Sequence, residues 1–157
     1  MYKSQVESGL STLYEMFPKG GSYNHAWNGS NTILSKYVAG VKPTKVGWSE
    51  YQIMPTLLHF TTLKKTIPTV NGNINIDIEV EDARYTMHLV SPENTVAIVG
   101  IPKTGKEIAE ILVNGKIVWK KGKMKKGNKA LDYVGECSEY VKFSIQPGTW
   151  NVSANYK

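Results

Sequence analysis

Cysteine, histidine and long apolar runs are scarce in this sequence of 157 residues. The one cysteine, Cys137, excludes an internal disulfide, and we expect it to be a small core residue. The three histidines, His25, His59 and His88, are isolated and lack the ligand spacing of a zinc site, so we expect no metal and no cofactor. No apolar run reaches the length of a membrane span and no signal peptide opens the chain, so we predict no membrane partner.

Acidic side chains are fewer than basic ones, which leaves a formal charge of +6. The excess is local, because seven lysines crowd between residues 116 and 129. Aromatic residues do not alternate with these lysines, as a platform for single-stranded nucleic acid would require. We therefore interpret the run as a solvated loop and predict no nucleic-acid partner.

One stretch resembles the start of a phosphate-binding loop. Gly100-Ile-Pro-Lys-Thr-Gly-Lys106 has the glycine and lysine spacing, but Glu107 stands where the loop needs Ser or Thr to hold magnesium. A carboxylate there would repel phosphates. We therefore predict a plain connection between two strands.

Alternating apolar and polar residues dominate the chain after Pro43. Residues 73–81 are the clearest case, because isoleucine and valine alternate there with Asn, Asp and Glu. Asn114-Gly115 is the strongest hairpin signal, and we expect residues 140–145 and 149–154 to pair about Pro147-Gly148. The predicted strands, about nine in all, cover residues 50–54, 60–65, 73–81, 85–89, 95–101, 111–113, 116–119, 140–145 and 149–154.

The predicted fold is mainly β, an antiparallel β-sandwich of about eight or nine strands preceded by a short helical segment. The helix is expected over Thr32 to Ala39, capped by Ser30 or Asn31 and stopped by Gly40. We expect two parts, residues 1–42 with this helix and residues 43–157 with the sandwich.

Residues 11–31 combine a carboxylate and an imidazole with several aromatic side chains. Tyr14, Glu15, Asn24, His25 and Trp27 are the side chains of interest here. Aromatic faces stack on sugar rings, while amide, imidazole and carboxylate groups bind sugar hydroxyls. The mixture favours a carbohydrate subsite.

These residues also carry a family resemblance. The segment Ser11-Thr-Leu-Tyr-Glu15 resembles the Thr-Thr-x-Trp-Glu motif of bacterial α-L-rhamnosidases of glycoside hydrolase family 78, and Ser22-Tyr-Asn-His25 resembles the Ser-x-Asn-His motif that follows it. Residues 33–40 and 43–55 resemble the exit from that family's helical barrel into its C-terminal β-domain. The detailed match covers roughly the first third of the chain, and Tyr14 departs from the family's usual Trp.

The resemblance implies an inverting hydrolase of terminal α-L-rhamnosides. Glu15 corresponds to the general base, His25 lines the sugar site, and Asn24, Tyr14 and Trp27 would contact the substrate. A barrel of about twelve helices, at roughly 11 residues each, does not fit this length, and the family's general acid lies upstream. We therefore expect a C-terminal fragment that is inactive alone, with a rhamnose-containing glycan as the intact enzyme's ligand.

Further expectations concern association and location. Apolar side chains of residues 1–42 that would pack on barrel helices favour association, so we expect either a homodimer or a disordered N-terminal region. The location of this chain stays open, although full-length relatives are often exported to the periplasm or outside.

Two alternatives to the enzyme fragment remain at this point. One is a carbohydrate-binding module with Trp48, Trp119 and Trp150 as a platform, although large aromatic residues in strands are more often core. The other is a purely structural sandwich.

Overall fold

The computed structural model describes residues 29–57, 59–125 and 130–157. The chain divides into two compact units, Met1–Leu34 and Ser35–Lys157. The helix α2 (Gly29–Ile33) ends the first unit, and a π-helical segment η2 (Leu34–Val38) follows it along the chain. The predicted short helix is therefore confirmed, with an earlier start, and Gly40 stops it at a φ of 68°.

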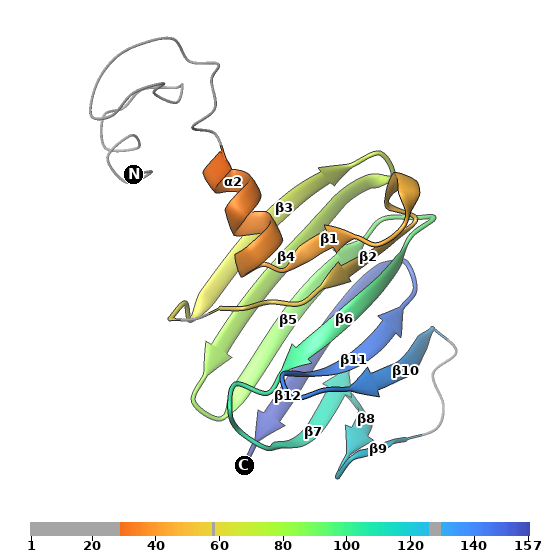
Figure 1. The fold of residues 1–157 in the computed structure, drawn as a ribbon. Coiled ribbons are helices and arrows are strands. Elements are labelled where there is room, and N and C mark those ends of the chain that lie inside the picture. The colour runs from red at the N-terminus through yellow and green to blue at the C-terminus, as the bar shows by residue number, and fades with distance from the viewer. Residues whose placement is uncertain (1–28, 58, 126–129) are drawn as a thin grey trace, which may run out of the picture. The chain divides into compact units, whose positions relative to one another are not determined.

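The described residues of the second unit form twelve strands in two sheets (Figure 1). The smaller sheet has the strand order β1 (Val41–Pro43), β2 (Glu50–Ile53), β6 (Val96–Pro102), β11 (Tyr140–Ile145), β10 (Leu131–Glu136). The larger sheet has the order β3 (Thr62–Thr69), β4 (Gly72–Glu81), β5 (Arg84–Ser91), β12 (Gly148–Tyr156), β7 (Ile108–Val113), β8 (Lys116–Lys120), β9 (Lys123–Met124). A short 3-10 helix, η3 (Val46–Trp48), joins β1 to β2.

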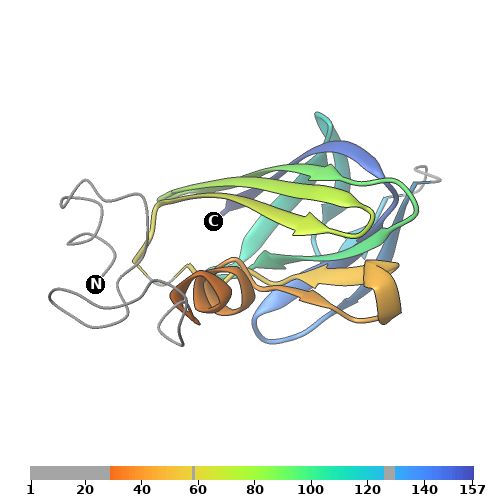
Figure 2. The same cartoon turned by 90° about the horizontal axis from the view of Figure 1, so that it is seen from above.

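The two sheets of this unit lie as two layers, which Figure 2 shows from above. Neighbouring strands are antiparallel except β2 and β6, which run parallel. Three strands of the larger sheet, β3 to β5, lie between β2 and β6 in the sequence, so the chain crosses to the other layer and returns.

The core lies between the sheets and follows from the alternation in sequence. Ile74, Ile76 and Ile78 of β4 are almost completely buried, while the residues between them lie on the outer face. Val99 and Phe143 bury the facing side of the smaller sheet. Removing such side chains from water contributes about 2 kcal/mol each, so the core is the main source of stability. The predicted antiparallel sandwich is confirmed.

The structure differs from the prediction in three short strands and one pairing. β1, β9 and β10 were not predicted, because each is only a few residues long or is interrupted, as β10 is by a register shift between Tyr133 and Gly135. The predicted pairing about Pro147-Gly148 is wrong, because β11 pairs with β6 and β10 whereas β12 pairs with β5 and β7. The chain therefore passes from one sheet to the other at Gly148, where φ is 125°.

The lysine-rich stretch is also more ordered than a solvated loop. Its described part, residues 116–125, contains the antiparallel pair β8 and β9 joined by a turn at Lys121-Gly122. In the described part of the chain no helix is long and apolar enough to span a membrane.

Candidate functional site

The predicted sugar-site residues lie outside the described part of the chain. Tyr14, Glu15, Asn24, His25 and Trp27 all fall within residues 1–28. Their roles therefore stay predictions, and the surfaces whose geometry is defined are those of the sandwich.

The two tryptophans of the sandwich strands face inward. Trp119 and Trp150 are 4% and 7% exposed, so the prediction that they are core residues is confirmed. Trp150 is fixed by a hydrogen bond from Nε1 to the carbonyl oxygen of Gln146, at 2.9 Å. Trp48 is partly buried against the core. These tryptophans therefore do not form an exposed stacking platform.

The tyrosines of β2 and β5 are buried as well. Tyr51 donates a hydrogen bond to the hydroxyl of Ser91 at 2.8 Å, and burial raises the pKa of Tyr51 to about 12. Burial likewise raises the pKa of Tyr85 well above its usual range. Both phenols therefore stay neutral.

Cys137 is exposed, so its predicted place in the core is wrong. β10 ends at Glu136, and Cys137 begins the connection to β11, with its N–H bonded to the carbonyl oxygen of Tyr140 at 2.9 Å. Hydrogen bonds from the backbone of Glu139 and then of Tyr140 lower the pKa of the Cys137 thiol. The sequence-based prediction relied on the type of side chain. The exposure of Cys137 instead follows from its position just after the end of β10.

The remaining histidines lie on the surface. His88 is exposed on the outer side of β5, as the alternation predicts, and its Nδ1 lies 2.8 Å from Oδ1 of Asn151. His59 lies in a turn before β3 rather than in a strand. Within residues 29–57, 59–125 and 130–157, no three His, Cys, Asp or Glu side chains are grouped to hold a metal.

The outer face of the larger sheet carries a hollow of about 420 Å³ whose lining mixes polar and apolar side chains. Strand register places Asp77, His88 and Asn151 in one row, and Glu79, Thr86 and Ser153 in the next. Lys64 pairs with Asp77 at 3.0 Å across β3 and β4. These rows offer donors and acceptors to a polar ligand.

A second hollow, about 480 Å³, lies where the described residues of the connection between β2 and β3 meet β6 and β11. The Tyr140 hydroxyl donates to the carbonyl oxygen of Pro55 at 3.0 Å, and its oxygen lies 3.2 Å from Oγ1 of Thr56. Phe60 is half exposed at its rim. These contacts hold the connection against the sheet.

The described carboxylates with shifted pKa values are ion-paired. Lys45 and Thr44 bond to Glu50 and lower its pKa. Lys120, at 2.8 Å, and Asn155 do the same for Glu110. A general acid needs a raised pKa, so neither carboxyl is suited to protonating a leaving group.

The stretch that resembles a phosphate-binding loop is a connection between strands, as predicted. Residues 100–102 end β6, a turn follows with positive φ at Thr104 and Gly105, and β7 begins at Ile108. Glu107 pairs with Lys157 at 2.6 Å. The helix that a phosphate-binding loop precedes is not present in these described residues.

The fold defines a two-sheet, mainly antiparallel β-sandwich domain with a largely aliphatic core that also holds several aromatic side chains. Residues 40–115, just under half of the chain, match the family model of the bacterial α-L-rhamnosidase C-terminal domain. The predicted resemblance to bacterial α-L-rhamnosidases is thereby confirmed over residues 40–115. No curated protein sequence matches the chain.

Solved α-L-rhamnosidase structures share the fold. That from Dictyoglumus thermophilum has a TM-score of 0.72 at 22% identity over 96% of this chain. That from Streptomyces avermitilis, complexed with L-rhamnose, has a TM-score of 0.68 at 18% identity over 95%. That from Aspergillus terreus has a TM-score of 0.57 at 17% identity over 95%. The chain covers only 17%, 14% and 15% of these proteins, respectively.

Proposed function

We propose that this chain is the C-terminal part of an inverting α-L-rhamnosidase and is inactive when isolated. Residues 1–42 would be the end of the catalytic helical barrel, and residues 43–157 the accessory sandwich that braces it. The match of residues 40–115 to the bacterial α-L-rhamnosidase C-terminal domain carries the proposal.

The chemistry assigned to the chain is half of an inverting site. An inverting glycosidase needs a carboxylic acid that protonates the leaving oxygen and a carboxylate that activates water on the opposite face of the sugar. Glu15 is the proposed base, with His25, Asn24, Tyr14 and Trp27 around the rhamnose. The described carboxyls of the sandwich that have shifted pKa values are paired with lysines, which fits a bracing role rather than a catalytic one.

An aryl α-L-rhamnoside tests this proposal. We expect the purified chain to release no rhamnose above the buffer rate, because a base without its acid does not form a working site. Release of rhamnose that Glu15→Gln abolishes would contradict the claim that the chain is inactive alone.

A chimera tests the role of Glu15 itself. When the barrel of a related rhamnosidase precedes this chain, β-L-rhamnose should be the first product seen by NMR, because attack by one water inverts the anomeric centre. Glu15→Gln should lower kcat by about 100-fold or more, while the control Glu7→Gln, outside the motif, should not. Equal effects of the two substitutions would refute the assignment of Glu15.

A further inference from the structure

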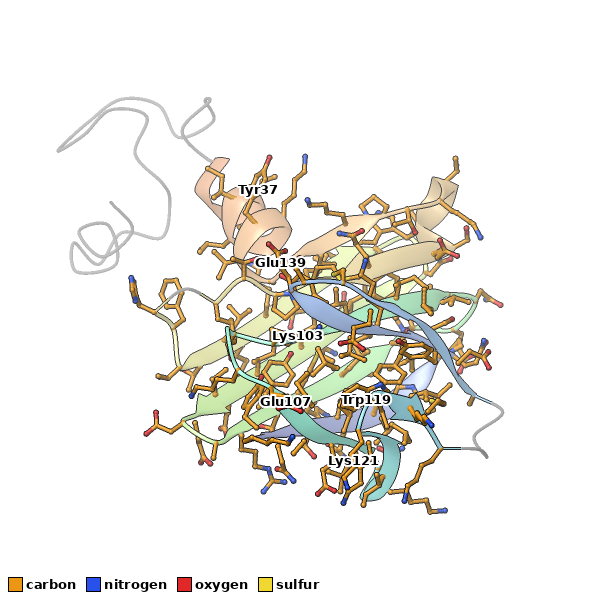
Figure 3. The ribbon with its side chains drawn as sticks, turned by 60° about the horizontal axis from the view of Figure 1, so that its bottom comes forward. Tyr37, Lys103, Glu107, Trp119, Lys121 and Glu139 are labelled. Atoms are coloured by element: carbon orange, nitrogen blue, oxygen red, sulfur yellow. The ribbon has the colours of Figure 1, made fainter. Side chains whose placement is uncertain are left out.

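A third hollow lies between the edges of the two sheets and has a volume of about 370 Å³. Its wall comes from the β6–β7 connection, from β8 and the turn after it, and from β10 at the edge of the smaller sheet. Figure 3 labels four of its residues, Lys103, Glu107, Trp119 and Lys121. The volume lies near the lower end of the range for small-molecule sites.

A β-bulge determines how Trp119 enters this wall. Ile111 pairs with Trp119 and Leu112 with Ile117, so Val118 is an extra residue in β8. Both Val118 and Trp119 are consequently buried, which regular alternation would not allow. Bulges of this kind re-aim side chains and are common beside functional sites.

The indole N–H of Trp119 is an unpaired donor. Trp119 is 4% exposed, and Nε1 has no hydrogen-bond partner among the described residues. Trp150 shows the usual arrangement, with its N–H bonded to a carbonyl oxygen. A buried donor without an acceptor is costly. Because Trp119 is also one of the residues that line the hollow, its orphan N–H favours a ligand there that supplies the acceptor.

The charges around the hollow favour an anion. Lys103 pairs with Glu136 at 2.6 Å, and Glu107 pairs with Lys157 at 2.6 Å. Both carboxylates are therefore neutralised by lysines. Lys106 donates to the carbonyl oxygen of Asp82, and Lys121 makes no ion pair with any described residue. Ammonium groups thus exceed carboxylates at this site.

We propose that this hollow binds a small hydroxylated carboxylate of the uronic-acid class. The carboxylate would accept hydrogen bonds from Lys121 and from the Trp119 N–H, and ring hydroxyls would donate to Glu107 and Glu136. The indole N–H is buried in this structure, so side chains around the hollow would have to move for the carboxylate to reach it. The site is separate from the proposed hydrolytic site, and its test does not depend on hydrolysis.

NMR titration of the intact chain tests the site directly, because each tryptophan indole N–H gives its own ¹H–¹⁵N signal. Trp119→Phe identifies the Trp119 signal by its disappearance. Addition of methyl glucuronide should shift that signal to saturation, whereas methyl glucoside, with the same ring but no carboxylate, should not shift it. A signal that does not move with the glucuronide, or that moves equally with both sugars, overturns the proposal.

Two matched charge reversals show whether binding of the glucuronide depends on this site or only on the overall charge of the chain. Lys121→Glu should weaken binding of the glucuronide about tenfold, because it removes the free ammonium group at the hollow. Lys116→Glu makes the same change in net charge at the other end of β8 and should leave the affinity as it is. Equal losses from the two variants would mean non-specific attraction and would overturn the proposal. Both lysines lie near the surface, so the comparison does not depend on the Trp119 variant folding.

Discussion

The backbone of Gly40 lies directly against the backbone of Met54. An added Cβ would lie 1.8 Å from the carbonyl oxygen of Met54, and Gly40 has a φ of 68°. The N–H of Met54 also donates to the carbonyl oxygen of Gly40 at 3.1 Å. Both the backbone conformation and the contact therefore require glycine here.

A pair of substitutions separates these two requirements. Gly105 has a similar φ of 73°, but an added Cβ there would meet no atom within 4 Å, so Gly105→Ala should lower the free energy of unfolding by only about 1 kcal/mol. Gly40→Ala adds a steric clash and should lower it by about 2–4 kcal/mol. Urea unfolding measures both, and equal losses would show that the contact with Met54 is unimportant.

The predictions for Cys137 and for the lysine-rich stretch were wrong because they relied on residue type alone. A small apolar side chain and a run of charges predict burial and solvation only on average. Cys137 is exposed because β10 ends just before it, and Lys120 is drawn into the sheet by its ion pair with Glu110.

At the scale of the element, the β7–β8 hairpin has the turn that its sequence demands. Asn114 and Gly115 have φ values of 48° and 76°, as a type I′ turn requires. The side chain of Asn114 accepts a hydrogen bond from the N–H of Asn151 at 2.8 Å, and its own N–H donates to the carbonyl oxygen of Asn151. The turn is therefore tied to β12.

Two substitutions at Asn114 distinguish the turn conformation from this side-chain bond. Asn114→Gly keeps the positive φ and loses the bond to Asn151, so the free energy of unfolding should fall by about 1 kcal/mol. Asn114→Ala loses the bond and also strains the backbone, so the loss should be about 2 kcal/mol. Urea unfolding gives both values. If Asn114→Ala lowers the free energy of unfolding no more than Asn114→Gly does, the positive φ at this position does not contribute to stability as we expect.

At the scale of the whole molecule, ion pairs make stability depend on pH. Glu50 and Glu110 have pKa values below the ordinary 4.5 in the folded protein. The unfolded chain therefore binds more protons as the pH falls below about 4.5, and the stabilisation is lost as the pH falls through the folded pKa values. Both carboxyls are partly accessible to solvent, which weakens the effect.

Acid unfolding measures this dependence. The double variant Glu50→Gln/Glu110→Gln should lose less stability between pH 5 and pH 3 than the unchanged chain, because it lacks two groups that take up protons on unfolding. Glu93→Gln removes a loop carboxyl that makes no ion pair with a described residue, and should keep the original slope. An unchanged slope in the double variant would show that the two ion pairs contribute nothing.

The sequence by itself determined the β class, nine of the strands and the buried side of the strand with the clearest alternation, residues 73–81. Alternation with a period of two is a local property, so Ile74, Ile76 and Ile78 could be placed in the core from their spacing alone. Turn chemistry at Asn114-Gly115 is equally local. The resemblance of residues 11–25 to the rhamnosidase motifs also needs only the sequence.

Only the tertiary structure decided which strands are neighbours and where hollows form. β11 and β12 are consecutive but lie in different sheets, because strand pairing depends on how both layers close around the core. The bulge at Val118 and the meeting of β8 with the β6–β7 connection and β10 likewise depend on distant segments. The hollow beside Trp119 is therefore assembled from residues that no local pattern connects.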